Sequence, residues 1–309
     1  MAASVCLIVN PSAGGGKSAR LAPAVLAELQ RHGLQARRVD TRDIEHARIA
    51  GREAAAAGET VVALSGDGLV GVLADELRAM PGAVLGVLPG GRGNDLARVL
   101  EISEDALEAC ATIAGGVARP IDLGVVEQAG APGGGGRAFV GIASAGFDSD
   151  ANRIANEAPP WLGGLVYAYG ALRALISWRP ARFEIELHPS GERHSFRGYT
   201  VAAANSRAYG GGMHMAPAAM LDDGLLEVIA VEAVGRLRFL ANLPRVFKGT
   251  HVELESVRVF RAPEATISSE RPFTMYADGD PIGVLPVRVR AVRGAVTMLT
   301  PPAGAAALS

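Results

Sequence analysis

Hydrophobic and polar positions follow two different patterns in the two halves of the chain. Over the first 120 residues, short β-branched runs separate segments whose apolar residues recur every three or four positions. Strands are predicted at residues 5–10, 35–40, 61–64 and 84–88, and the first of them is expected to be buried. The intervening segments predict helices at residues 18–32, 44–57, 70–80, 94–100 and 103–114. This alternation is typical of an α/β domain with a mostly parallel sheet covered on both faces.

After Arg119-Pro120 the pattern changes to strand-like segments separated by turn residues. Strands are expected at residues 121–127, 138–143, 182–188, 195–204, 225–232, 252–261, 265–268, 273–276 and 286–292. Helices are expected near residues 148–156, 162–177 and 236–247. We therefore predict a β-rich, antiparallel, sandwich-like C-terminal domain over residues 120–297, after an α/β domain over residues 1–119. Residues 298–309 either pack back on the first domain or fray.

Composition narrows the class of protein. A length of 309 residues suggests about two domains, and 49% hydrophobic residues with 5% aromatics predict a core of Ala, Val and Leu. The net charge of −2 argues against nucleic acid as a partner. Two cysteines, Cys6 and Cys110, are too few for a disulfide framework, which favours a reduced cytosolic setting.

Nothing in the sequence predicts a membrane span or a signal peptide. No apolar run approaches the roughly 18–20 residues that a spanning helix needs. The first ten residues lack a basic region, so residues 5–9 are interpreted as a strand. We expect a cytoplasmic protein. If it acts on lipid, it does so from the membrane surface, at the inner face, or by extracting its substrate.

Two successive strands end in glycine turns that hold a carboxylate. The first is Ser65-Gly66-Asp67-Gly68, and the second is Pro89-Gly90-Gly91-Arg92-Gly93-Asn94-Asp95. A strand that ends in such a turn before a helix presents backbone N–H groups to a phosphate. The carboxylate beside them can hold the magnesium ion of a nucleotide. A third acidic turn, Asp278-Gly279-Asp280, follows late in the chain.

Each of these signals has a plainer interpretation. The acidic turns at Asp67, Asp223 and Asp278 could be ordinary turns, and Asn94 could merely cap a helix. Residues 11–18 nearly match a Walker A loop, and Gly14 and Gly16 fit a loose dinucleotide fingerprint that pairs with Asp40. A tight turn explains that segment equally well, although Lys17 and Arg20 could reach an anion from its first helical turn.

One apparent catalytic motif is incomplete. Ser144 resembles a nucleophile elbow, but Ile142 stands where that motif requires its first glycine. This departure argues against a hydrolase.

In their order along the chain, the motifs resemble those of the diacylglycerol kinase catalytic family. The resemblance is to its bacterial lipid kinase branch, which is similar to sphingosine and ceramide kinases. The resemblance spans about residues 5 to 299 and rests on Asn10-Pro11, Ser65-Gly66-Asp67-Gly68, Leu88-Pro89, Asn94-Asp95, Ile121-Asp122-Leu123-Gly124, Asn205-Ser206-Arg207, Asp222-Asp223-Gly224 and Asp278-Gly279-Asp280. It implies an N-terminal domain like those of NAD kinase and 6-phosphofructokinase. It also implies an active site in the cleft between two domains.

The resemblance implies an ATP- and Mg²⁺-dependent lipid kinase that transfers the γ-phosphoryl group to a lipid hydroxyl. Catalytic roles fall to Asp67, Asp278 and Asp280, with the last turn supplying the general base. Nucleotide contacts and a polar network near the phosphates fall to Asn10, Lys17, Arg20, Ser65, Gly66, Gly68, Gly91, Arg92, Asn94, Asp95, Arg98 and Asp122. Magnesium ligands fall to Asp67 and, at a structural site, to Asp223 with the backbone carbonyls of Met220 and Leu225.

Several positions depart from the family pattern. Ser65 replaces a glycine, Leu69 and Arg92 each replace a threonine, and Val70-Gly71 stand where Asn-Glu is common. Asp280 is one methylene shorter than the usual glutamate. Arg92 could offset the lost hydroxyls, because a guanidinium group binds phosphate bidentately.

Three hypotheses stay open on the sequence. The first is a lipid kinase with peripheral membrane contact, for which we also expect a homodimer and an apolar cleft. Candidate wall residues, which could equally form a core helix, are Trp161, Leu162, Leu165, Val166, Tyr167 and Tyr169. The second is an NAD kinase-like enzyme. The third is a catalytically weakened homologue that binds nucleotide or lipid.

Overall fold

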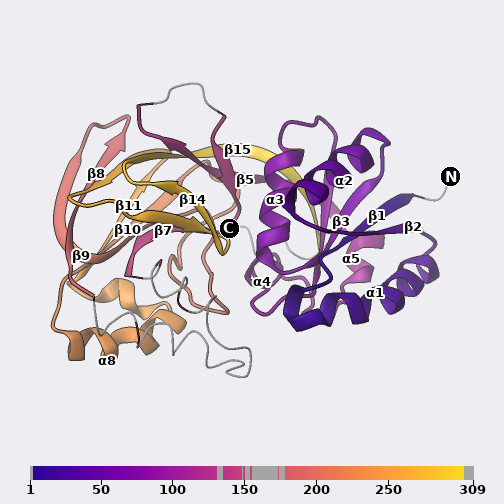
Figure 1. Cartoon of the computed structure of the whole chain (residues 1–309), viewed down its shortest axis with the longest axis horizontal. Helices are drawn as coiled ribbons and strands as arrows, with labels where there is room; N and C mark the ends of the chain where they lie inside the picture. The colour runs from indigo at the N-terminus through magenta and orange to yellow at the C-terminus, as the bar shows by residue number, and fades with distance from the viewer. Residues whose placement is uncertain are drawn as a thin grey trace.

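The computed structural model describes residues 3–130, 135–147 and 178–302, together with Ser149, Ile154 and Arg173. The chain forms two lobes, with the N-terminal α/β lobe on the right of Figure 1 and a β-rich lobe on the left. Strand β15 (Val287–Thr300) runs between them. None of the helices within the described ranges is long and apolar enough to cross a membrane.

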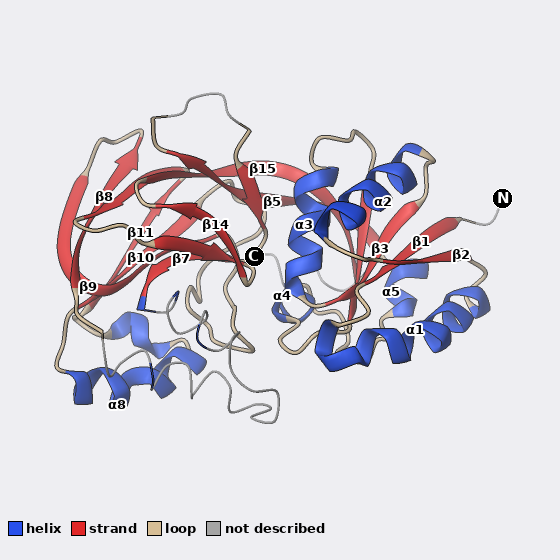
Figure 2. Ribbon diagram, in the orientation of Figure 1, coloured by secondary structure: helices blue, strands red, loops and turns tan. Residues whose placement is uncertain are grey.

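The N-terminal lobe is built on four parallel strands in the order β2-β1-β3-β4. Their bounds are β1 (Ser4–Val9), β2 (Gln35–Asp40), β3 (Thr60–Ser65) and β4 (Val84–Pro89). The helices are α1 (Ala13–Arg31), α2 (Ile44–Ala56), α3 (Asp67–Leu77), α4 (Asp95–Val99) and α5 (Cys110–Gly115). Helices α2 and α3 cover one face of the sheet, and α1 and α5 cover the other (Figure 2). This arrangement confirms the predicted α/β class.

The helix predicted over residues 103–114 is wrong in its first half. Only α5 is helical, whereas residues 103–109 form turns. There the Ser103 hydroxyl accepts the Asp105 N–H at 3.2 Å, and the Asp105 carboxylate accepts the Leu107 N–H at 2.7 Å. Such side chain–backbone bonds compete with the helical ladder, which explains the delayed start.

The C-terminal lobe consists of antiparallel strands, as predicted. These are β5 (Val117–Gln128), β6 (Arg137–Phe139), β7 (Ile142–Gly146), β8 (Ala181–His188), β9 (Arg193–Ala204), β10 (Leu226–Glu232), β11 (Val257–Ala262), β12 (Glu264–Ser269), β13 (Thr274–Ala277), β14 (Asp280–Val284) and β15. Apolar side chains from β5 to β10, β12, β13 and β15 pack into one core. Helix α8 (Arg236–Phe247) and the 3₁₀ helix η2 (Thr250–Glu253) follow β10.

Several predicted strands have different bounds. The strand expected over residues 138–143 is two strands, β6 and β7, because the N–H groups of Val140 and Gly141 between them bond the Asp278 carboxylate. The strand expected over residues 252–261 begins only at Val257, because η2 and a turn precede it and the Val257 N–H bonds the Leu254 carbonyl. The last strand runs on to Thr300 rather than ending at residue 292. The helices expected at 148–156 and 162–177 fall almost wholly outside the described residues. The wall candidates Trp161, Leu162, Leu165, Val166, Tyr167 and Tyr169 also lie outside them.

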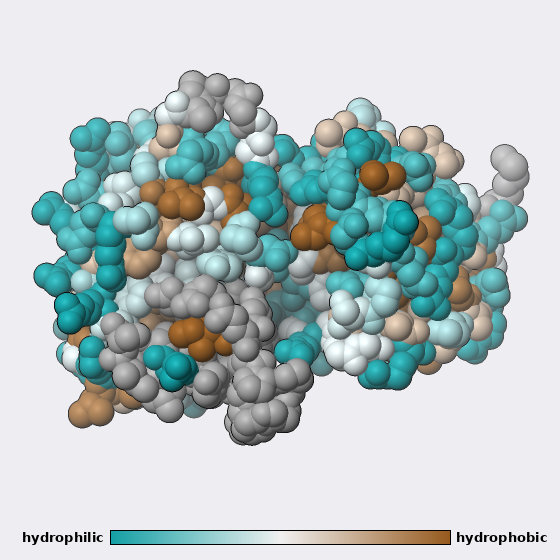
Figure 3. All heavy atoms as spheres, viewed as in Figure 1, coloured by the Kyte–Doolittle hydropathy of each residue, from teal (hydrophilic) through white to brown (hydrophobic). Residues whose placement is uncertain are grey.

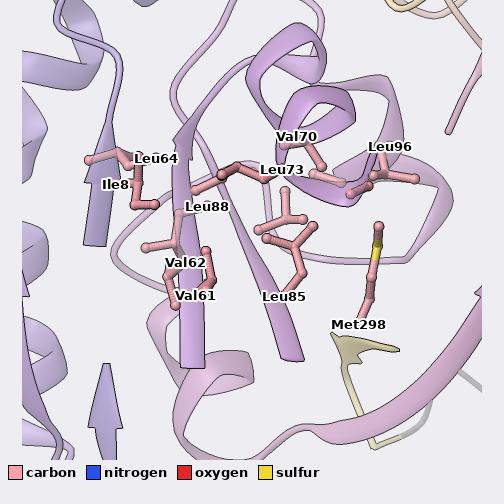
Figure 4. Close-up of a cluster of buried hydrophobic side chains, with 14 of the residues drawn as sticks. Ile8, Val61, Val62, Leu64, Val70, Leu73, Leu85, Leu88, Leu96 and Met298 are labelled. Carbon is pink, nitrogen blue, oxygen red and sulfur yellow. The ribbon is translucent and has the colours of Figure 1, made fainter. Parts of the chain in front are cut away.

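Strand β15 connects the two lobes through hydrogen bonds. Near its start it pairs antiparallel with β12, and near its end Thr297 and Met298 pair in parallel with β4. The Met298 side chain lies in the N-terminal core with Leu85 and Leu96 (Figure 4). The fifteen strands of the described residues thus form one continuous sheet, which fixes the lobes relative to each other.

The glycine turns of the N-terminal lobe pack backbone against backbone. A Cβ atom on Gly91 would lie 2.4 Å from Gly66 Cα, and one on Gly14 would lie 2.5 Å from the Gly90 carbonyl oxygen. The Ser18 hydroxyl also donates a hydrogen bond to the Gly90 carbonyl at 3.1 Å. Three turns that are far apart in the sequence therefore meet at the carboxyl edge of the sheet.

We expect Gly91→Ala to lower the free energy of unfolding by about 1–3 kcal/mol, because Gly66 Cα is backbone and cannot rotate away. Urea unfolding measures this loss. The matched control is Gly115→Ala, whose new methyl group would have no atom within 4 Å. Equal stability of the two variants would contradict the close packing of the turns.

Candidate active site

A cavity of about 870 Å³ lies where the two lobes meet. The N-terminal lobe contributes both acidic glycine turns, including Asp67 and Asp95. The C-terminal lobe contributes Asp278 and, farther along, an apolar wall. The wall includes Phe147, Met215, Phe239, Leu240, Leu243 and Leu254. One end of the cavity is therefore acidic and lined by backbone, and the rest is mostly apolar.

Asp67 is the first residue of α3 and bonds a second helix. Its two carboxylate oxygens accept the N–H groups of Asp95 and Leu96, each at 3.0 Å. The carboxylate thus bonds the first turn of α4 and fixes the two acidic turns together. Burial raises the pKa of Asp67, the charge of Asp95 adds to this effect, and the Leu96 amide opposes it.

Asp95 ties the second turn to the C-terminal lobe. Its carboxylate accepts the N–H groups of Gly211 and Gly212, each at 2.7 Å. Arg98 Nη1 donates to the same carboxylate at 2.8 Å. The side chain is buried, so these bonds hold the Gly210-Gly211-Gly212 loop against the N-terminal lobe.

Asp278 lies in the two-residue turn between β13 and β14, with a φ of 51°. Its carboxylate accepts the N–H groups of Val140 and Gly141 at 2.8 and 2.9 Å. Burial raises the pKa of Asp278 to about 7, and the charges of Asp67 and Asp280 add to this effect against the two amides. The acids of the two lobes therefore face one cavity, and the charge of Asp67 affects the pKa of Asp278.

Gly71 has a structural role that its departure from the family pattern did not suggest. A Cβ atom on Gly71 would lie 2.7 Å from Asp278 Oδ2. Any side chain on this face of α3 would push Asp278 out of its place. The missing side chain at position 71 therefore gives Asp278 its room.

Asp280 begins β14 and lies beside the cavity, outside its lining. Its Oδ2 is 3.6 Å from the position of a Cβ atom on Gly68, so it approaches the first acidic turn. Burial raises the pKa of Asp280, and Arg137 opposes the shift.

Some of the other residues predicted to contact the nucleotide line the cavity, and some do not. Gly66, Gly68 and Arg92 line the cavity with the acids. Ser65, Gly91 and Asn94 belong to the same two turns and Arg98 to α4, and none of the four lines the cavity. The Asn94 amide closes its turn by bonding the backbone of Gly91 in both directions, at 2.8 and 3.2 Å.

Asn10, Lys17 and Arg20 belong to the third glycine turn, which packs against the second. Asn10 Oδ1 accepts the N–H and the hydroxyl of Ser12 at 3.1 and 2.8 Å. Lys17 and Arg20 are exposed, and Arg20 Nη1 donates to the Gly15 carbonyl at 3.3 Å. None of these three residues lines the cavity.

Asp122 is buried away from the cavity lining. Its carboxylate accepts the N–H groups of Gly224 and Gly294 at 2.6 and 2.7 Å, and its carbonyl accepts Asn205 Nδ2 at 2.8 Å. It therefore ties a turn to the irregular part of β15, where the register with β5 shifts.

Asp223, the predicted ligand of a structural magnesium ion, is already partnered. One carboxylate oxygen accepts the Leu225 N–H at 2.8 Å, and the other forms an ion pair with Arg261. Within the described ranges, no group of three or more His, Cys, Asp or Glu side chains has the arrangement of a metal site. The site at Asp223, Met220 and Leu225 stays a prediction, and Arg261 already supplies a positive charge there.

Sequence reasoning missed two buried polar groups on the cavity wall. Ser206 is 1% exposed and His251 is 3% exposed, and both line the cavity. In the described part of the chain, Ser206 Oγ and His251 Nδ1 have no hydrogen-bond partner. Ser206 stands in a motif that carried the resemblance, whereas nothing around His251 in the sequence marked it.

Comparison with known proteins identifies the family. Residues 4–126 match the diacylglycerol kinase catalytic domain, and residues 141–300 match the YegS C-terminal NAD kinase beta sandwich-like domain. A diacylglycerol kinase from Mycobacterium tuberculosis is 33% identical over 305 residues, covering 97% of this chain and 96% of the relative. The chain therefore belongs to the diacylglycerol kinase catalytic-domain family and is a kinase.

Other relatives agree. A diacylglycerol kinase from Bacillus subtilis is 28% identical, covering 91% of this chain and 90% of the relative. A relative named as a YegS-like lipid kinase from Xanthomonas euvesicatoria is 32% identical, covering 85% and 88%. The crystal structure of a diacylglycerol kinase from Bacillus anthracis has a TM-score of 0.74 at 20% identity, covering 97% of each chain. This last comparison supports the fold.

We expect Asp122→Ala to lower the free energy of unfolding by about 2–4 kcal/mol, because it removes two part-buried hydrogen bonds to a buried, charged carboxylate. Urea unfolding at neutral pH measures the change. Asp40→Ala is the control, since it removes only an exposed ion pair worth about 0–1 kcal/mol. If both variants are as stable as the wild type, the bonds of Asp122 do not hold the lobe as described.

Proposed function

We propose that this chain transfers the γ-phosphoryl group of ATP, with Mg²⁺, to a hydroxyl group of a lipid. The observation that carries the proposal is the composition of one cavity, whose acidic, glycine-lined end continues into an apolar wall. Phosphoryl transfer requires positioning and neutralisation of charge at one end, and a lipid requires an apolar cleft at the other. The names of the relatives agree with this class of substrate.

The glycine turns fit the phosphates of a nucleotide. Gly66 precedes the first turn of α3 with no side chain capping the helix, and Gly66, Gly68 and Gly93 all line the cavity. Backbone N–H groups at a helix N-terminus attract phosphate. Arg92 is exposed at the same edge, so we propose that its guanidinium group pairs with a phosphate oxygen.

The acids fit a magnesium ion that arrives with the nucleotide. Burial raises the pKa values of Asp67 and Asp278, because two negative charges are unfavourable at the buried acidic end of the cavity. Mg²⁺ usually takes one or two carboxylates together with substrate phosphates and water, so a preformed cage is not required. We propose that Asp67 holds this ion, which when bound neutralises charge on the transferred group.

Asp278 suits the role of general base toward the lipid hydroxyl. A base works best with a pKa near the operating pH, and the pKa of Asp278 is about 7. Two backbone amides fix its carboxylate, whereas no amide within the described ranges bonds the carboxylate of Asp280. We therefore assign the base to Asp278 and leave a supporting charge to Asp280.

Two observations weigh against the alternatives. The apolar wall favours a lipid over the polar dinucleotide that an NAD kinase-like enzyme would take. Gly71, one of the departures that suggested a weakened homologue, makes room for Asp278. The altered turn is thus compatible with an active enzyme.

Transfer of radiolabelled phosphate from ATP tests the proposal. The acceptors are diacylglycerol, phosphatidylglycerol, sphingosine and phosphatidylinositol, with NAD⁺ as the control for the NAD kinase-like alternative. We expect a labelled lipid that forms only when Mg²⁺ is present. Labelling of NAD⁺ alone would reverse the choice between the two enzymes. If ATP and lipid raise the melting temperature but no acceptor is labelled, the chain is a binding protein instead.

Replacing the proposed base should remove most of the activity. We expect Asp278→Asn to lower kcat on the order of 10²–10⁴-fold, the usual contribution of a positioned base. For the wild type, kcat/KM should rise about tenfold per pH unit below pH 7 and level off above it, because only the carboxylate form accepts a proton. Asp280→Asn, the matched control, should lose far less. A flat pH profile, or a larger loss in the control, would move the base elsewhere.

Replacing Asp67 should act on the metal. We expect Asp67→Asn to lower kcat on the order of 10²-fold or more and to raise the Mg²⁺ concentration needed for half-maximal rate. Circular dichroism checks that the variant folds, since the Asn oxygen can still accept one of the two α4 amides. An unchanged Mg²⁺ requirement would remove the ion from Asp67.

A further inference from the structure

Helix α8 forms part of the cavity wall but is not itself buried. The side chains of Phe239, Leu240, Leu243 and Val246 line the cavity, and Phe239 stacks on Tyr199 with ring centroids 4.1 Å apart. Yet no residue of α8 is fully buried. The helix therefore lies on the outside of the β-rich lobe, as Figure 1 shows at lower left.

The outer side of α8 combines cations with apolar side chains. Leu237 is 83% exposed and Phe247 is 52% exposed. The exposed residues, which we call the α8 surface, are Arg236, Leu237, Arg238, Ala241, Pro244, Arg245, Phe247 and Lys248. Two of them, Pro244 and Phe247, also line the cavity. The segment 236–248 holds four cations and no Asp or Glu, in a chain whose net charge is −2. Figure 3 shows both hydrophobic and hydrophilic residues at the surface where α8 lies.

We propose that the α8 surface docks on an anionic lipid bilayer. Helices that lie in a membrane interface carry Lys and Arg beside exposed Leu and Phe, as α8 does. Clustered cations are attracted to the negative surface of a membrane, and Leu237, which does not line the cavity, supplies the apolar contact. Because α8 is also a cavity wall, docking would place the cavity against the bilayer that holds its substrate.

This inference rests on the proposed function in one respect: the lipid substrate explains why docking on a bilayer would be useful. The attraction itself follows from the charge and exposure of α8. A second copy of this chain is a poorer occupant, because a symmetric contact would bring four cations against four.

Co-sedimentation with vesicles, without ATP, tests the proposal. The wild type should bind phosphatidylcholine vesicles containing about 30% phosphatidylglycerol more tightly than pure phosphatidylcholine, and the binding should weaken from about 0.05 to 0.5 M salt. Arg238→Glu with Arg245→Glu should weaken binding on the order of 10-fold or more. The matched control, Arg52→Glu with Arg193→Glu, makes the same charge change at exposed sites on α2 and β9. It should bind like the wild type.

Leu237→Ser tests the apolar contact separately from the charges. Leu237 does not line the cavity and is exposed, so its replacement leaves the core intact. It should weaken vesicle binding while leaving phosphoryl transfer to lipid in detergent micelles unchanged. Equal binding by the α8 and control variants, or no preference of the wild type for anionic vesicles, would overturn the docking proposal. Self-association of the protein, seen as a larger sedimenting mass without vesicle binding, would also overturn it. Because binding is measured without ATP, these results are separate from any failure of kinase activity.

Discussion

The site depends on buried carboxylates that accept backbone N–H groups from distant loops. Asp67 bonds the first turn of α4, Asp95 bonds the loop at Gly211 and Gly212, and Asp278 bonds Val140 and Gly141. Each carboxylate loses water on burial, and the amides restore only part of that loss, so the pKa values of Asp67 and Asp278 stay raised. The bonds of Asp67 and Asp278 position these acids within their own lobes, and the bonds of Asp95 to Gly211 and Gly212 hold the two lobes together beside the cavity.

The continuous sheet explains why the cavity has two chemical ends. The carboxyl ends of the parallel strands deliver glycine turns to the junction of the lobes, and the paired strand β15 fixes the β-rich lobe beside them. The acidic end thus receives backbone and carboxylates, while the outer faces of β9 and β10 and helix α8 receive apolar residues. A phosphate and a hydrocarbon chain can be accommodated in one continuous space.

Much of this arrangement could be predicted from local patterns. The buried strands of the N-terminal lobe follow from their β-branched runs, and the Asp-Gly turn at Asp278 follows from its hairpin signal. Contacts between distant residues could not be predicted in this way. The room that Gly71 leaves for Asp278, and the partners of Asp122, depend on segments far away in the chain. His251, whose Nδ1 has no hydrogen-bond partner in the part of the chain that the structure describes, had no local signal for the same reason.

A crystal structure with Mg²⁺, a non-hydrolysable ATP analogue and diacylglycerol tests the central claim most directly. The account predicts phosphates against the turns at Gly66 and Gly93, with the metal ion on Asp67 and the acceptor hydroxyl within hydrogen-bond distance of the Asp278 carboxylate. A nucleotide bound outside this cavity, or a hydroxyl remote from Asp278, would contradict it.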